Sequence, residues 1–186
     1  MELTEAIFKR RSIRKFTHYY VNDEEIKQIL EAGRWAPSWA NTQAWIFIVV
    51  RDKDIINKVT STYSETNPAR PCSFTASVLL AACAKKGVSG CKDGVERTKF
   101  NNWFMFDLGL AVQNISLKAH DLGLGSVIVG SMDHNKCNSV LSVQGEFEVV
   151  AIIPIGKPDA PETAKSSRKP LEAITYLNKF GEPYFG

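Results

Sequence analysis

Apolar residues recur at helical spacing in several parts of the chain. Residues 2–9 carry such a pattern, and a run of basic residues follows where this helix would end. A second helix is predicted to begin after Asn22 or Asp23, whose side chains can cap its first turn, and to stop before Pro37. The same signals predict two shorter helices: one over 54–63 with Asp52 as its cap, and one from Asp133 to about Leu141.

Four short runs predict buried β-strands. Each is apolar almost throughout, is bounded by turn-forming residues, and is too short for a typical helix. The runs cover residues 45–50, 78–84, 126–129 and 147–155. Segment 67–71, with two prolines, is predicted to be a loop, and the polar segment 85–97 an exposed excursion that could act as a lid. Helices and strands occur without an internal repeat or linker, so we expect one α+β domain over residues 1–186.

The longest predicted helix covers residues 100–122 and is apolar on two faces. Its stripes are Phe104, Leu108, Ala111, Ile115, Ala119 and Leu122 on one face, and Trp103, Phe106, Leu110 and Leu117 on the other. One face can pack on the chain's own sheet, and the other would remain exposed to solvent unless a second subunit covered it. We therefore predict a homodimer with this helix at its interface; the alternative is a helix wrapped entirely by its own domain. The aromatic tail from Arg168 onward is also expected to pack, and the partner subunit is one surface available to it.

Composition places the chain among globular proteins. With 186 residues, 44% of them hydrophobic and 23% charged, it can bury a hydrophobic core without the help of disulfides or structural metals. Its apolar runs are far shorter than the roughly 18–20 residues that span a bilayer, so no membrane helix is expected. Acidic residues at positions 2 and 5 are unlike the start of a secretory signal, which predicts a cytoplasmic protein.

The cysteines and histidines form no metal-binding pattern. The four cysteines include no C-x-x-C pair, and the three histidines show no H-x-x-x-H spacing. We therefore expect neither a metal site nor a disulfide framework. Cys83, inside an apolar run, is predicted to be a small buried hydrophobe.

Positive charge is concentrated at one point of the chain. The formal net charge is +3, yet five basic residues fall within positions 9–15. Nucleic-acid binding usually needs many phosphate contacts spread along a surface, whereas one compact cluster suits one compact anion. We expect no nucleic-acid partner.

Common catalytic motifs are absent from the sequence. It contains no G-x-x-x-x-G-K-[ST], no G-x-S-x-G and no H-E-x-x-H, and the glycines of 123–130 do not have dinucleotide-fold spacing. What remains is Arg10-Arg-Ser-Ile-Arg14, a Pro-Ser segment before the first strand, Gly130 after a strand, and Arg168. Guanidinium groups and a serine hydroxyl are suited to a phosphate, although an arginine-rich helix end is also typical of a solvated surface.

In this arrangement the chain resembles the nitroreductase family of FMN-dependent oxidoreductases. The matching pieces stand in the family's order: Arg10-Arg-Ser-Ile-Arg14, Ala36-Pro-Ser-x-x-Asn41-x-Gln43-x-Trp45, Gly123-Leu-Gly-Ser, Gly156-x-Pro158 and Arg168-Lys-Pro-Leu-Glu172. The resemblance implies an α+β three-layer sandwich, with a central, mainly antiparallel sheet flanked by helices. It also implies an intertwined homodimer with FMN at the subunit interface.

The resemblance assigns roles to the arginine residues. Arg10, Ser12 and Arg168 would hold the FMN phosphate, and Arg14 would lie near the N1 and O2 edge of the flavin. Arg11 would serve either the ribityl chain or the phosphate. A cation near N1 stabilises the charge that accumulates on a reduced flavin.

Two further segments are assigned to the flavin by the resemblance. One reaches the cofactor from the other subunit and consists of Pro37, Ser38, Asn41 and, as a weaker candidate, Gln43. The backbone of Val129 and Gly130 would approach flavin N5. Trp39 is either an aromatic wall for the acceptor or a core residue, and Asn67 and Arg70 lie roughly where larger family members contact the flavin ring.

The implied reaction needs no catalytic side chain, because the flavin carries the redox chemistry. NADH or NADPH passes hydride to flavin N5 and leaves, and a nitroaromatic, quinone or similar small-molecule acceptor takes its place in a ping-pong order. Two alternatives stay open: a flavoprotein of the same fold with a specialised substrate, deiodinase-like or flavin-destroying, and an anion- or nucleic-acid-binding module that uses the basic residues of 9–15.

Overall fold

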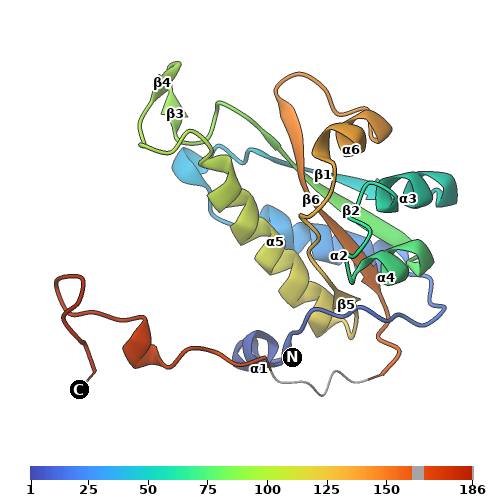
Figure 1. Ribbon diagram of the computed structural model, residues 1–186, viewed down its shortest axis with the longest axis horizontal. Helices are drawn as coiled ribbons and strands as arrows, with labels where there is room; N and C mark the ends of the chain where they lie inside the picture. Colours follow the sequence, from blue (N-terminus) through green and yellow to red (C-terminus); the bar gives the residue numbers. More distant parts are fainter. Residues whose placement is uncertain (161–165, 186) are drawn as a thin grey trace.

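A computed structural model of the protein describes residues 1–160 and 166–185. Four antiparallel strands form its central sheet in the order β1-β2-β6-β5 (Figure 1). The strands are β1 (Trp45–Val50), β2 (Val78–Lys85), β5 (Gly125–Ser126) and β6 (Phe147–Gly156). The central pair runs in register from Val78 opposite Ile155 to Lys85 opposite Phe147, with one irregularity after Ala82.

Helices cover both faces of this sheet. One layer consists of α2 (Asp23–Arg34) and α5 (Phe104–Asp121), and the other of α3 (Lys53–Thr60), α4 (Arg70–Thr75) and α6 (His134–Val140). Alternate residues of the central strands supply the two cores: Leu80 and Ile153 lie with the first layer, and Leu79 and Ile152 with the second. This burial on both faces explains why the strands are apolar throughout, and the predicted three-layer α+β sandwich is confirmed.

The predicted helix caps act through specific hydrogen bonds. Asn22, rather than Asp23, caps α2, and its side chain forms a reciprocal capping box with Glu25. Asp52 and Asp133 accept backbone hydrogen bonds at the starts of α3 and α6. Three of the predicted helices therefore begin where the polar signals place them.

Three predicted boundaries are wrong. The segment predicted as a loop contains the start of α4, because Pro71 stands in the first turn of this short helix, where its missing N–H costs nothing. The strand predicted over 126–129 is reduced to Gly125–Ser126, with an isolated pair between Val129 and Ile152. The long helix begins at Phe104, after a turn, rather than at residue 100.

The N-terminal helix α1 (Leu3–Lys9) leads into an extended segment that runs beside β5. Ser12 pairs with Ser126 in a parallel bridge, and Ile13 packs so closely on Gly125 that a Cβ there would lie 2.7 Å from it. Leu3 and Phe8 on α1 are exposed in the single chain.

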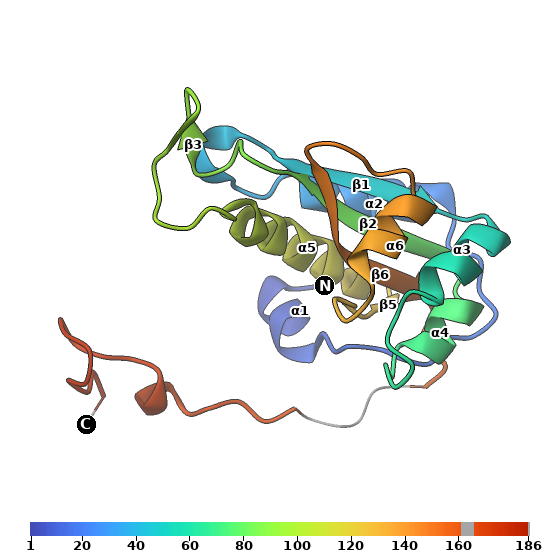
Figure 2. The same cartoon turned by 45° about the horizontal axis from the view of Figure 1, so that its top comes forward.

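Polar segment 85–97 leaves the sheet as an excursion, as predicted, and carries a small hairpin of β3 (Cys91–Lys92) and β4 (Val95–Glu96). The hairpin projects beyond the start of α5 (Figure 2). No helix in the described part of the chain is both long enough and apolar enough to cross a membrane.

The C-terminal tail stretches away from the sandwich (Figure 2). It contains a short 3-10 turn, Leu171–Ala173, and its aromatic residues pack only locally, as Tyr176 does on Phe180 with ring centroids 4.8 Å apart. Phe180 is 91% exposed. Within one chain the tail is therefore uncovered, and its predicted packing on a partner remains a prediction.

Candidate functional site

The arginine cluster lies along the outer edge of the sheet beside β5. Ile13 donates its backbone N–H to the Ser126 carbonyl at 3.0 Å, which fixes the extended segment that follows α1. Arg10 and Ser12 are partly buried on this segment, and Arg14 is exposed. Backbone pairing with β5 therefore fixes the position of the segment that carries the cluster.

Like charges gather around Arg10. Burial lowers the pKa of its guanidinium, and the positive charges of Arg11 and Arg168 lower it further. Among the described residues, no carboxylate lies within ion-pair distance of any of these three arginines or of Arg14. Guanidinium groups held together without a counter-charge fit a bound anion.

Arg11 differs from its neighbours in what it contacts. Its Nη1 donates to the carbonyl oxygens of Phe8 and Arg10 at 2.7 and 2.8 Å, so it closes the C-terminal end of α1. This use of the side chain favours a local structural role for Arg11 over a direct phosphate contact.

A buried histidine nitrogen lies close to the same cluster. His120, near the end of α5, has a buried Nε2 with no hydrogen-bond partner among the described residues. Burial lowers its pKa, and the charges of Arg10 and Arg11 add to this effect. An anion bound by the cluster would offset the mutual repulsion of the guanidinium groups and the positive potential at His120.

Gly130 presents a free backbone donor at the end of the 126–130 segment. Its neighbour Val129 is paired with Ile152 in both directions at 2.9 Å, whereas the N–H of Gly130 has no acceptor in the described part of the chain. A Cβ placed on Gly130 would meet nothing within 4 Å, and Ile128 is 51% exposed beside it. The result is an open, partly apolar surface with one unused N–H.

His134, which was not among the predicted site residues, and Asn67, which was placed near the flavin ring by resemblance, both support this segment. His134 lies between Gly130 and β6, with its ring nitrogens 2.9 and 3.1 Å from the carbonyl oxygens of Val149 and Gly130; a neutral imidazole has one N–H and donates to one of these carbonyls at a time. Asn67 donates to the Ser131 carbonyl at 3.3 Å. Asn67 thus adjoins the surface of Gly130, whereas Arg70 lies on α4 over the ring of Phe74.

The Pro-Ser segment forms a strained loop that includes a 3-10 turn, Trp39–Asn41. Ala40, Asn41 and Gln43 have φ angles of 45, 56 and 47°, in the left-handed region. Such residues cost about 1–3 kcal/mol each and persist only where surrounding contacts fix them, often at functional sites. Ser38 accepts the Gln43 N–H through its Oγ at 3.0 Å, and Gln43 donates to the Asn41 side chain at 3.2 Å.

The predicted site residues therefore fall into two groups at opposite ends of α5. His120 lies beside the arginine cluster, whereas Asp107 accepts the backbone N–H of Trp39 at 3.1 Å. These two positions are about 20 Å apart along the helix at 1.5 Å per residue. The structure brings Ser12 and the arginines to the segment that leads to Gly130, but it does not bring residues 37–43 to them within one chain.

Comparison with known proteins assigns this arrangement to a family. The family model described as Nitroreductase family matches residues 7–157. The chain belongs to the nitroreductase family. It is 30% identical over 200 residues to an oxygen-insensitive NADPH nitroreductase of Helicobacter acinonychis, covering 91% of this chain and 93% of that protein. It is 31% identical over 196 residues to an FMN reductase [NAD(P)H] of Bacillus subtilis, covering 96% and 76%.

A solved structure of another nitroreductase family protein shows the same fold. A candidate nitroreductase of Desulfovibrio desulfuricans, solved in complex with FMN, superposes with a TM-score of 0.76 at 30% identity. The alignment covers 95% of this chain and 96% of that one. The predicted family resemblance is therefore confirmed.

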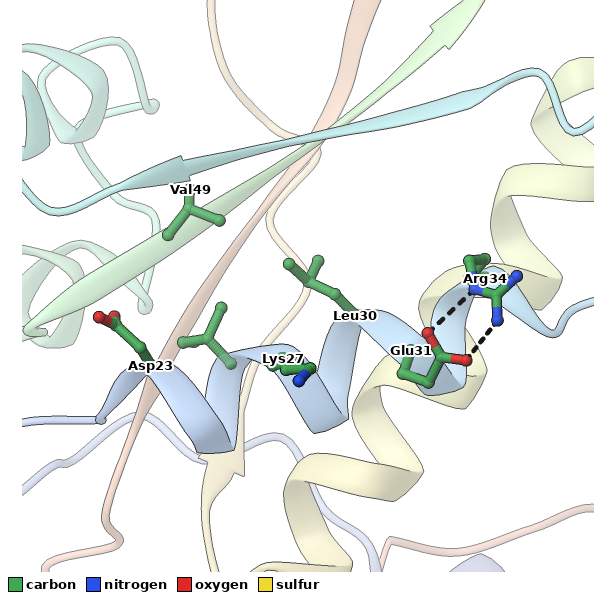
Figure 3. A pocket seen from close by; sticks show the side chains of 7 residues that line it. Asp23, Lys27, Leu30, Glu31, Arg34 and Val49 are labelled. Carbon is green, nitrogen blue, oxygen red and sulfur yellow. Dashed lines mark hydrogen bonds and ion pairs between the residues drawn. The ribbon is translucent and has the colours of Figure 1, made fainter.

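A separate groove of this family member lies between α2 and β1 (Figure 3). Its volume is about 490 Å³, and Ile26, Leu30 and Val49 form its apolar floor. Arg34 forms a two-pronged contact with Glu31, and this hydrogen bonding lowers the pKa of Glu31 to about 2. None of the predicted cofactor residues lines the groove, which is therefore distinct from the candidate flavin site.

Proposed function

We propose that this protein is a homodimeric, FMN-dependent oxidoreductase that takes hydride from NADH or NADPH and reduces small electron-poor acceptors such as nitroaromatics or quinones. The observation that carries the proposal is the pairing of Ser12 with Ser126, which sets the uncompensated arginines beside the segment that ends at the unused N–H of Gly130. The FMN named in the description of the Desulfovibrio structure, and the nicotinamide nucleotides named for the Helicobacter and Bacillus proteins, supply the cofactor and donor classes.

The phosphate of FMN is proposed to bind to Arg10, Ser12 and Arg168. The positive charge of Arg168 lowers the pKa of Arg10, although the two residues are far apart in the sequence. Each charge-assisted hydrogen bond from a guanidinium contributes about 1.5–3 kcal/mol. Arg11 is proposed to act mainly by holding the end of α1, through its contacts with backbone carbonyls.

The ring of FMN is proposed to lie over the segment that ends at Gly130. The Gly130 N–H donates toward N5, with Val129 fixing the strand, and Arg14 supplies positive charge at the N1 and O2 edge. FMN, when bound, accepts hydride from the nicotinamide donor and delivers reducing equivalents to the acceptor. The chain's own residues bind the phosphate, orient the ring and leave one face open, so no acid, base or nucleophile is required.

Residues 37–43 are proposed to contact the FMN of the other subunit. Pro37, Ser38, Asn41 and the weaker candidate Gln43 lie about a helix length from the arginine cluster of their own chain, so a second copy must supply them to a shared site. The outward face of α5 offers the surface for this pairing, because Met105 and Phe106 are 50% and 60% exposed.

Purified protein tests the proposal directly. A yellow solution with flavin absorption that bleaches anaerobically on addition of NADPH or NADH and recovers on addition of a nitroaromatic or quinone would support it. Stopped-flow reduction with each nucleotide, followed by a panel of oxidants, would separate the donor from the acceptor. Colourless protein that binds no added FMN would contradict it and favour the anion-binding alternative. A cytoplasmic location remains a prediction from the sequence.

A further inference from the structure

One buried carboxylate joins two segments that are far apart in the sequence. Asp107, in the first turns of α5, is 1% exposed. Its Oδ2 accepts the backbone N–H of Trp39 at 3.1 Å and a short hydrogen bond from the hydroxyl of Ser89. No cation lies within ion-pair distance of it among residues 1–160 and 166–185. A buried charge without an ion partner is tolerated only when its hydrogen bonds are well placed. Loss of either contact would therefore destabilise this arrangement.

The first of the two segments is the strained loop of residues 37–43. Its remaining hydrogen bonds are internal, such as Thr42 to the Trp39 carbonyl at 2.9 Å and Gln43 to the Ser38 hydroxyl at 3.0 Å. In the described part of the chain, Asp107 supplies the one hydrogen bond that ties the segment 38–43 to another element. The left-handed residues Ala40 and Asn41 directly follow the bonded amide. The carboxylate therefore holds the loop at the point where its unfavourable backbone begins.

The second segment is the root of the excursion that carries β3 and β4. Ser89 is buried, and the next residue, Gly90, packs so closely on Trp103 that a Cβ would lie 2.8 Å from it. Arg97 closes the hairpin by donating its N–H to the Gly90 carbonyl at 2.8 Å. The start of the excursion is therefore bound, through Ser89, to the same Asp107 carboxylate that holds the Pro-Ser loop.

We propose that Asp107 is a positioning residue for the flavin site. It fixes the Trp39 amide and the Ser89 hydroxyl at one point, so that Ser38 and Asn41 are presented to the cofactor in a preformed arrangement. This inference rests on the proposed function, because it takes residues 37–43 to be a cofactor-contacting segment. When a binding-competent arrangement is only fractionally populated, the apparent dissociation constant rises by the inverse of that fraction.

Three variants and one control test this role in the intact dimer. Asp107→Ala removes both contacts, and Ser89→Ala removes one. Asp107→Asn can place its amide oxygen where Oδ2 lies and accept from both Trp39 and Ser89 without the charge, and is expected to rescue. The control is Ser116→Ala, a buried position on the same helix; among the residues the structure describes, its hydroxyl bonds only to the Val112 carbonyl. FMN affinity is measured by fluorescence titration of apoprotein, and hydrogen exchange is followed in the peptide that spans residues 36–44.

Asp107→Ala is expected to weaken FMN binding about tenfold or more, because it removes two hydrogen bonds to a charged group. It should also speed hydrogen exchange in the 36–44 peptide of the apoprotein. The FMN dissociation constants of Asp107→Asn and Ser116→Ala should stay within about threefold of the wild-type value. The FMN affinity and the exchange rate of Ser89→Ala should lie between those of Asp107→Ala and those of wild type. If Asp107→Ala fails to fold, Ser89→Ala and Asp107→Asn carry the test.

The outcomes separate this inference from the proposed function. Wild-type protein that binds no FMN contradicts the function, whereas the exchange measurement on apoprotein still tests the contact. Folded Asp107→Ala with wild-type exchange and wild-type FMN affinity would overturn the positioning role. Asp107→Asn as impaired as Asp107→Ala would overturn the hydrogen-bonding argument, because the charge alone would then account for the effect.

Discussion

Ser12 pairs with Ser126 in a parallel bridge, and this contact joins the arginine segment to the chain that ends at Gly130. This pairing sets the arginine segment beside the start of the segment that leads to Gly130, as the proposed binding of the FMN phosphate near Arg10 and of the ring near Gly130 requires. Arg168 reaches the same region from the opposite end of the sequence.

Arg168→Ala is expected to raise the dissociation constant for FMN about tenfold or more, since a charge-assisted hydrogen bond contributes about 1.5–3 kcal/mol and 1.4 kcal/mol is a factor of ten. Arg11→Ala should have a smaller effect, because Arg11 already donates to the carbonyls of Phe8 and Arg10. Fluorescence titration of apoprotein gives both values.

Riboflavin is the control ligand for this pair, because it lacks the phosphate. Its affinity should be the same in Arg168→Ala and wild type. Equal losses for riboflavin and FMN, or a larger effect from Arg11→Ala, would contradict the assignment of the phosphate to Arg168.

His134→Ala is expected to lower the rate of flavin reduction by NADPH or NADH more than it lowers FMN affinity. The ring of His134 contacts the carbonyl of Gly130 at 3.1 Å, so its loss frees the segment proposed to face N5 while the phosphate contacts remain. Stopped-flow reduction measures the first quantity and apoprotein titration the second.

Asn138→Ala provides a matched control for His134. Asn138 also ties α6 to β6, through the Val149 N–H and the Glu148 carboxylate, but it does not contact Gly130. If the two variants lowered the rate of flavin reduction equally, His134 would act by holding α6 on β6 rather than through its contact with Gly130.

Much of the fold could be predicted because the signals are local. The capping role of Asn22 and the apolar run of β2 follow from residues that lie within a few positions of each other. The boundaries that were missed depend on distant partners instead. Val129 leaves the strand ladder except for its pair with Ile152. Helix α4 starts at Arg70, with Pro71 in its first turn, and buries Cys72 and Ser73.

The sequence indicated which residues could form the candidate site, but not how the fold places them relative to one another. The arginines and Gly130 were identified through family resemblance, but nothing local says that the Pro-Ser segment lies at the far end of α5 from them. Both stripes of α5 are apolar, so the sequence did not distinguish the inward stripe of Leu108 from the outward stripe of Phe106. Asp107 carried one usable signal, a lone acid between apolar neighbours on an otherwise buried helix face.

Thiol reactivity is expected to be confined to one cysteine per chain. Burial raises the pKa of Cys72 and Cys137 to about 11 and that of Cys83 to about 12, whereas Cys91 is partly exposed on the excursion. At pH 8 a thiol with a pKa of about 11 is thiolate in only about one molecule in a thousand. Ellman's reagent should therefore titrate one thiol per native chain and four in denaturant.

The same shifts predict a loss of stability in alkali. The raised thiol pKa values favour the neutral form in the folded state, so the stabilisation is complete below about pH 9 and is lost as the pH rises through 11 to 12. Cys91→Ser should abolish the rapid native reaction and leave the alkaline unfolding profile unchanged. More than one fast thiol per chain would contradict the burial of the other three.

Phe106→Asp is expected to lower both oligomeric mass and bound flavin, because it places a charge on the exposed face of α5 beside Trp103, whose ring centroid is 5.5 Å away. Ile55→Asp is the control, since Ile55 is exposed on α3 in the opposite layer and should change neither quantity. Light scattering and flavin absorbance give both readouts. A monomer that keeps full FMN affinity would contradict the shared site.

Removal of residues 171–186 separates the aromatic part of the tail from Arg168, which the shortened chain keeps. The deleted segment carries a set of exposed apolar side chains: Leu171, Ile174, Tyr176, Leu177, Phe180, Tyr184 and Phe185. A partner subunit that covers them would gain about 25 cal/mol for each Å² of apolar surface removed from water, so their loss should weaken the dimer. Analytical ultracentrifugation should then show dissociation at protein concentrations where the full chain stays dimeric, with FMN affinity reduced only under those dissociating conditions. An unchanged dimer would mean that the tail does not cover the partner, and a loss of FMN from an intact dimer would place the tail at the cofactor itself.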